Sequence, residues 1–214
     1  MRELLASAAL GLALPWQGLM AHVPYFEDKD LSADAPFLIE NIEQSKAIYA
    51  HLDSEQDIDV LLLVVREPVR IYAKTIIPYC REYRDFRPSF ALTGPALPEA
   101  GDDFPSAPEP QHGGLLRRDL AVGATRPSMY EFFSDQFYFE GPILDINVTE
   151  PGNYRLWFWD ETGAVGDYVA IVGKREEFSV EDIRRSFWNT PEIRRRGYLH
   201  VDCEEPEQDN DPEQ

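Results

Sequence analysis

The sequence predicts an all-β protein folded as one antiparallel β-sandwich domain, and two observations lead to this prediction. Residues 141–173 read as three short strands, ILDINV, YRLWFW and DYVAIVG, separated by the turn sequences EPGN and DETGAVG. Val, Ile, Tyr, Phe and Trp are concentrated in these strands, as is typical of sheets. Similar short segments recur upstream, and 214 residues is a usual length for a single sandwich domain.

The first half of the chain is expected to supply four strands. Residues 22–40 are polar and contain two prolines, so we expect an extended lead-in there. Residues 45–52 and 58–65 follow as strands, and the second, IDVLLLVV, is apolar on both faces, which favours a central position. Apolar and polar residues alternate over residues 69–78, which indicates a half-buried strand. The segment PSFALT at residues 88–93 completes this set.

The composition changes to Pro, Gly, Asp and Ala between residues 94 and 125, which predicts a long loop because prolines cannot support a continuous ladder. Loops of this size are either functional or disordered, and both alternatives stay open. Aromatic side chains gather at residues 130–139. Packing of the sandwich explains them, and a sugar-stacking platform is the alternative.

The C-terminal part is expected to hold one short helix and a tail. Residues 179–188 are predicted to be an amphipathic helix with Ser179 as its N-cap. The acidic residues 201–214 are expected to form a disordered tail, which leaves residues 22–200 as the single sandwich domain. The apolar residues at helical spacing are Val180, Ile183 and Phe187.

The N-terminus has the layout of a secretory signal peptide. An apolar run at residues 4–14 follows Arg2, and a proline and small residues come next. Cleavage after Met20 or Ala21 would remove a signal peptide of residues 1–21, and a buried N-terminal helix is the alternative. Because no second apolar segment of spanning length follows, we expect a soluble protein in the periplasm or outside the cell, without a transmembrane segment after signal cleavage.

The cysteine count agrees with export. Cys80 and Cys203 are the two cysteines of the chain. In an oxidising compartment an even pair favours one disulfide, which would tie the end of an early strand to the C-terminal segment. Two unpaired thiols are the alternative.

The charge balance restricts the class of partner. The chain has 39 acidic and 20 basic residues and a formal net charge of −19. This excess repels nucleic acid and anionic lipid, so neither is expected as a partner. It permits cation binding, although an acidic surface also serves solubility alone.

Three turn-and-strand motifs carry a resemblance to a known family. They are Leu92-Thr93-Gly94-Pro95, Pro151-Gly152-Asn153-Tyr154 and Gly166-Asp167-Tyr168. Together with the strands before them, these motifs make residues 42–173 similar to the bacterial pre-peptidase C-terminal (PPC) type of β-sandwich. The resemblance implies a jelly-roll-like sandwich with a non-enzymatic accessory role in an exported protein, and some members of the family are implicated in binding a substrate, a partner or calcium.

The histidines suggest a metal site. If the signal were cleaved after Ala21, the chain would begin with His22, whose free amine and imidazole could chelate one Cu(II) ion in the arrangement of a histidine brace. A further ligand would have to come from the other histidines. These are His51, His112 and His200.

Calcium is the second candidate cation, because the acidic turns at residues 53–59 and 160–167 offer several carboxylates. The sequence has no nucleophile elbow, zinc-protease motif, phosphate loop or Cys/His cluster, so no enzyme is predicted. Glu131, Glu140 and Asp145 are the carboxylates that could pair as glycosidase acids. We therefore expect a non-catalytic binding or accessory protein for an unknown protein, carbohydrate or metal ligand, with copper binding as the alternative function.

Overall fold

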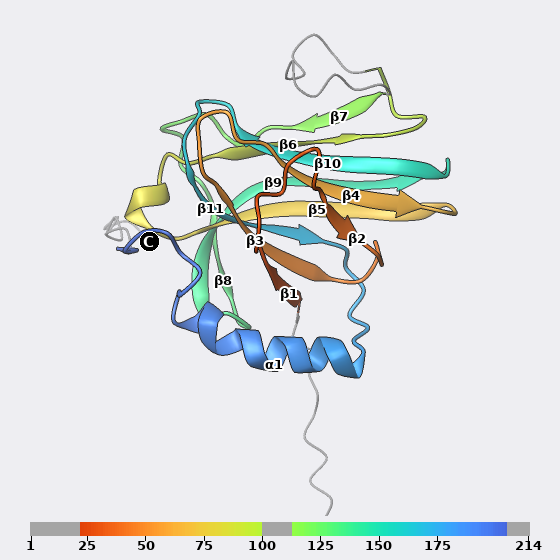
Figure 1. Ribbon diagram of the computed structural model, residues 1–214. Coiled ribbons are helices and arrows are strands. Elements are labelled where there is room, and N and C mark those ends of the chain that lie inside the picture. Colours follow the sequence, from red (N-terminus) through yellow and green to blue (C-terminus); the bar gives the residue numbers. More distant parts are fainter. Residues whose placement is uncertain (1–21, 100–112, 205–214) are drawn as a thin grey trace, which may run out of the picture.

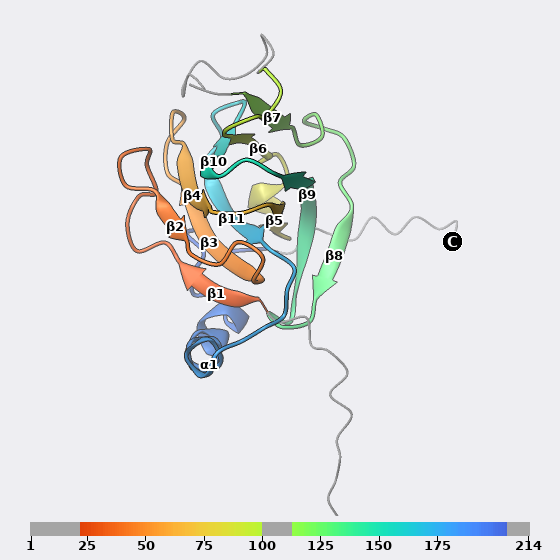
Figure 2. The same cartoon turned by 90° about the vertical axis from the view of Figure 1, so that its right-hand side faces the viewer.

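The computed structural model describes residues 22–99 and 113–204 and shows a β-sandwich of two sheets, which confirms the predicted fold class (Figure 1). Apolar side chains from both sheets meet in one continuous core between them. The helix α1 (Val180–Arg194) lies at the foot of the sandwich beside β1 in both views (Figure 2). Among the described residues, no helix is both long enough and apolar enough to cross a membrane.

The larger sheet has six strands. In spatial order these are β1 (Val23–Phe26), β3 (Lys46–Leu52), β11 (Gly166–Val172), β5 (Val69–Pro78), β9 (Gln136–Val148) and β8 (Ser128–Glu131). All neighbours pair antiparallel except β1 and β3, which are parallel.

The smaller sheet has five strands. In spatial order these are β2 (Phe37–Ile39), β4 (Asp59–Val65), β10 (Gly152–Asp160), β6 (Pro88–Thr93) and β7 (Gly114–Arg117). Here β2 and β4 are the parallel pair. The strand predicted to be central, β4, lies one position in from the edge.

The predicted lead-in at residues 22–40 is wrong in part, because it contains β1 and β2. Each is a short apolar run, VPYF or FLI, inside the otherwise polar segment, and each adds to the edge of a sheet, where an extended segment pairs with unpaired backbone groups. Pro24 is tolerated because edge strands need only half of their backbone groups for pairing. The buried side chains Val23 and Ile39 fix the two strands to the core region.

Two other boundaries differ from the prediction. The predicted loop at residues 94–125 contains β7, while residues 100–112 lie outside the described residues. The predicted strand ILDINV is longer than expected, because the aromatic segment QFYFEGP before it belongs to the same strand, β9. The ladder between β5 and β9 shifts its register between Lys74 and Ile76, opposite Gly141. A Cβ atom added to Gly141 would collide with Thr75. The glycine therefore allows a bulge inside a continuous strand instead of ending it.

The helix begins as predicted but buries a different face. Ser179 is the N-cap and forms a capping box with Asp182. The helix continues to Arg194, past the predicted end at residue 188, and its buried residue is Ile193. Ile193 packs with Tyr49, Tyr138 and their neighbours on the outer face of the six-stranded sheet. The apolar residues of the predicted face are exposed: Val180, Ile183 and Phe187, together with Trp188.

The predicted disulfide between Cys80 and Cys203 is confirmed, so the alternative of two free thiols is wrong. Cys80 follows β5 and immediately precedes the short 3₁₀ helix η1 (Arg81–Tyr83). Cys203 closes the segment that follows α1, within the predicted tail. The predicted signal peptide and residues 205–214 lie outside the described residues.

Two of the sequence motifs meet in space around Tyr154. Its ring is fully buried and lies so close to Gly94 that any side chain at position 94 would overlap it. Its hydroxyl lies 2.9 Å from the carbonyl oxygens of both Pro95 and Glu150 and donates to them. The LTGP and PGNY motifs thus form one packing unit that joins the end of β6 to the start of β10.

We predict that Tyr154→Phe lowers the free energy of unfolding by about 1–3 kcal/mol, because the part-buried hydrogen bonds of its hydroxyl to the carbonyl oxygens of Pro95 and Glu150 are lost. Urea unfolding followed by tryptophan fluorescence measures this. Tyr130→Phe is the matched control, because the Tyr130 hydroxyl bonds Asp135 at the surface and its loss should cost less than about 0.5 kcal/mol. Equal losses in the two variants would contradict the assigned role of Tyr154.

Candidate functional site

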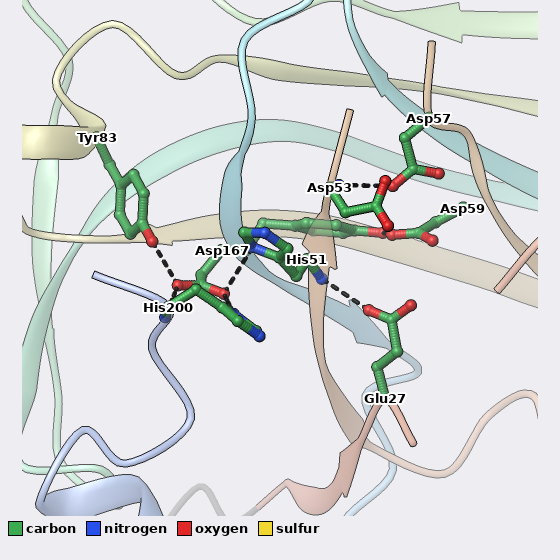
Figure 3. A network of polar contacts seen from close by, with 9 residues as sticks. Glu27, His51, Asp53, Asp57, Asp59, Tyr83, Asp167 and His200 are labelled. Carbon is green, nitrogen blue, oxygen red and sulfur yellow. Dashed lines mark hydrogen bonds and ion pairs between the residues drawn. The ribbon is translucent and has the colours of Figure 1, made fainter. Parts of the chain in front are cut away.

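An acidic pocket of about 640 Å³ opens at the end of the six-stranded sheet where β1, β3 and β11 meet the segment after α1. Seven carboxylates and two histidines line it, and Lys29 is the one lysine or arginine among the lining residues that the structure describes. Such an excess of one charge in a concave site attracts cations. Two groups of side chains lie at the pocket, one centred on Asp167 and one on Asp59 (Figure 3). Glu27 and Asp30 of the second group line the pocket, whereas Asp59 itself is fully buried and is not a lining residue.

The first group is built on a cross-strand pair. Asp167 and His51 are register partners on β11 and β3. Their neighbours Tyr168 and Ala50 point into the main core, so the alternation of the strands turns Asp167 and His51 to the outer face. Directly opposite side chains on one face lie within contact distance, and Nδ1 of His51 is 3.0 Å from Oδ1 of Asp167.

Two distant segments complete this group. His200 follows α1, and its Nδ1 lies 2.6 Å from the same Oδ1 of Asp167, while its backbone N–H donates to Oδ2 over 2.8 Å. Tyr83 lies in η1, and its hydroxyl donates to Oδ2. The Cys80–Cys203 disulfide holds both segments, because Cys80 precedes η1 and Cys203 lies three residues after His200.

The hydrogen bonds decide how the two imidazoles are protonated. An ionised carboxylate only accepts, so each ring donates through Nδ1–H, and Nε2 carries a lone pair whenever the ring is neutral. The two rings are stacked, with centroids 4.0 Å apart and planes inclined by 29°. The side chain of Asp167 is 2% exposed, whereas that of His51 is 21% and that of His200 is 61% exposed. The carboxylate is therefore the buried part of the group, and the imidazoles are its solvent-accessible part.

The electrostatics match this geometry. Burial alone would raise the pKa of Asp167, but the hydrogen bonds from His51, Tyr83 and His200 outweigh it and hold that pKa below its ordinary value. In turn, the bond to Asp167 raises the pKa of His51 against the opposing effect of burial. Asp167 is therefore ionised at neutral pH.

The second group comprises Glu27, Asp30 and Asp59, whose carboxylate oxygens lie within 4.8 Å of one another. Glu27 follows β1, and its Oε2 accepts the backbone N–H of His51 over 2.8 Å, which links the two groups. Asp59 is the first residue of β4 in the opposite sheet and is fully buried. Tyr168 donates to its Oδ2 over 2.7 Å, but Oδ1 has no hydrogen-bond partner among the described residues.

The structure describes three of the four histidines that the sequence suggested as metal ligands. His51 and His200 are brought together, whereas His112 lies outside the described residues. His22 lies at the opposite end of β3, where its Nδ1 is 2.5 Å from Oγ of Ser45, and the extended chain from Ser45 to His51 spans about 20 Å. His22 therefore does not join the other two described histidines in one site.

The carboxylates considered as glycosidase acids have other partners. Glu131 accepts the backbone N–H groups of Phe133 and Ser134 in the β8–β9 turn. Glu140 pairs with Lys74 at 3.1 Å. Asp145 accepts from Arg70 and Lys174. Each of the three thus stabilises local structure.

Sequence reasoning missed Glu27, Asp30 and Tyr83. It treated Asp59 only as part of an acidic turn, and Asp167 as part of an acidic turn and of the Gly166-Asp167-Tyr168 motif. One signal was present for Asp167. In DYVAIV it is the charged member of an otherwise apolar strand, and a charge at such a position requires a partner. The partner residues come from segments far away in the sequence, so their identity could not be read from the strand.

The chain matches no protein-family model and no curated protein. A function for the pocket is therefore inferred from the chemistry of its own residues.

We predict that the imidazole of His51 titrates above the ordinary histidine pKa of 6.5 and that of His22 below it, because Asp167 stabilises the His51 cation whereas burial disfavours that of His22. NMR titration of the histidine ring protons measures both. Asp167→Asn should lower the pKa of His51 and leave His22 unchanged. The control Asp145→Asn removes a carboxylate outside the pocket and should change neither. An unchanged His51 in Asp167→Asn would contradict the assigned ion pair.

Proposed function

We propose that this chain is an exported, PPC-like binding module. We further propose that it binds calcium at its pocket through the carboxylates of Glu27, Asp30 and Asp59. The observation that carries the proposal is Oδ1 of Asp59, which is buried and has no hydrogen-bond partner among the described residues. A buried polar atom without a partner costs about 1–3 kcal/mol. A cation bound between Asp59 and the two other carboxylates would give this oxygen a partner.

The charge arrangement supports this choice. Burial and the nearby carboxylate of Glu27 raise the pKa of Asp59 to about 8, and Asp57 and Asp30 add to the effect. Four carboxylates that repel one another are stabilised together when one divalent cation lies between them. Calcium takes six to eight oxygen ligands at distances of about 2.3–2.6 Å, which Glu27, Asp30 and Asp59 would supply together with carbonyl oxygens and water.

Export and a binding role are supported by separate features. The disulfide is typical of a protein that folds in an oxidising compartment. The described lining residues of the pocket include no Ser, Thr or Cys beside His51 that could act as a nucleophile. The PPC resemblance of residues 42–173 agrees with an accessory module, and calcium is a ligand that the resemblance allows.

We predict that calcium stabilises the protein through Asp59. Extracellular calcium modules bind with Kd of about 0.1–1 mM, so 10 mM calcium should raise the melting temperature by about 3–10 °C over the same protein in chelator. Differential scanning calorimetry measures the shift. Asp59→Asn should abolish it, and Glu67→Gln, in the exposed β4–β5 turn, is the control that should keep it. A calcium shift that survives Asp59→Asn would overturn the proposed site.

We also predict a pH effect in the absence of calcium. The pKa of Asp59 is raised from 3.8 to about 8 in the folded protein. Its contribution to stability is therefore fully present below about pH 4 and is lost as the pH rises through 8. Relative to Asp59→Asn, the wild type in chelator should lose up to about 1.4 kcal/mol of unfolding free energy for each unit between pH 5 and 8. Urea unfolding at several pH values measures this, and parallel profiles would contradict the assignment.

A further inference from the structure

We infer that His51, His200 and Asp167 form a second cation site in the same pocket, specific for a transition metal ion such as Zn²⁺ rather than for calcium. The ligand atoms of these three residues all lie within 4.8 Å of one another. The inference does not depend on the calcium proposal, because the two sites share no ligand residue.

The two imidazole nitrogens already lie close to one carboxylate oxygen. Nδ1 of His51 and Nδ1 of His200 lie 3.0 and 2.6 Å from the same Oδ1 of Asp167. A zinc ion with bonds of 2.0–2.2 Å holds tetrahedral ligands about 3.3 Å apart, so small side-chain shifts admit the ion. Each neutral ring then changes tautomer: Nδ1 binds the metal, and the proton moves to Nε2.

The surroundings hold the carboxylate ligand in place. Oδ2 of Asp167 accepts the hydroxyl of Tyr83 and the backbone N–H of His200, which leaves Oδ1 directed at the two imidazoles. Hydrogen bonds of this kind to a ligating group typically change metal affinity by 10–100-fold. All three residues line the pocket, and the exposure of His200 provides an entry path for an ion.

The ligand types separate the two sites. Imidazole nitrogen is a preferred ligand of zinc and copper, whereas calcium prefers oxygen alone. The group of Glu27, Asp30 and Asp59 offers only oxygen, and the group of His51, His200 and Asp167 offers two nitrogens and one oxygen. The pocket thus presents a hard and a borderline cation site side by side, joined by the bond from His51 N–H to Glu27.

The test uses the exported protein, purified without a histidine tag and stripped with chelator. Zn²⁺ is titrated in competition with a chromophoric chelator, and Co²⁺ is added separately to record the visible absorption of a low-symmetry site. We expect one competitive Zn²⁺ equivalent per chain. His51→Ala and His200→Ala should each weaken it at least about 10-fold and abolish the Co²⁺ spectrum, and Tyr83→Phe should weaken it about 10-fold.

His22→Ala is the matched control and should bind Zn²⁺ as the wild type does. The side chain of His200 is mostly exposed, so His200→Ala should remain folded, and its unchanged melting temperature in chelator checks this. Zinc affinity that survives both His51→Ala and His200→Ala, or that is lost in His22→Ala, would overturn the inference. Asp59→Asn should lose the calcium effect and keep zinc binding, so each proposal fails on its own measurement.

Discussion

The buried carboxylate of Asp167 is the constraint on which this end of the molecule depends. An ionised carboxylate is stable inside a protein only when its oxygens are hydrogen-bonded. Asp167 therefore gathers Tyr83, His51 and both the ring and the backbone of His200 around it. Because these residues come from a strand, a 3₁₀ helix and the C-terminal segment, satisfying one side chain holds three remote parts of the chain over the outer face of the larger sheet.

Asp59 differs from Asp167 in its hydrogen bonds and in its pKa. Both are buried aspartates at the start of strands, and both accept a tyrosine hydroxyl. Asp167 has donors for both oxygens, whereas one oxygen of Asp59 has none among the described residues. The pKa values of the two side chains consequently move in opposite directions. The calcium proposed at this group would supply the partner that Oδ1 of Asp59 lacks among the described residues.

The disulfide relates the fold to the pocket. Cys80 lies next to the η1 turn that carries Tyr83, and Cys203 lies near His200, so the covalent link keeps two of the four residues of the Asp167 group at their places. It closes a loop of more than a hundred residues, which restricts the unfolded chain strongly.

The sequence by itself determined the features that depend on neighbouring residues. These include the strands with clear alternation and the Ser179 cap. The cysteine pair was also predictable, because the chain has only two cysteines. The tertiary structure decided whether the short runs VPYF and FLI became edge strands β1 and β2, and which face of α1 was buried. Both depend on the surface that distant parts of the chain provide. The tertiary structure also brought the residues of the candidate site together. His51 meets Asp167 through strand register, and His200 reaches them from a segment 33 residues further on. Local pattern carries no information about such pairings, since residues that share a binding site need be close only in space.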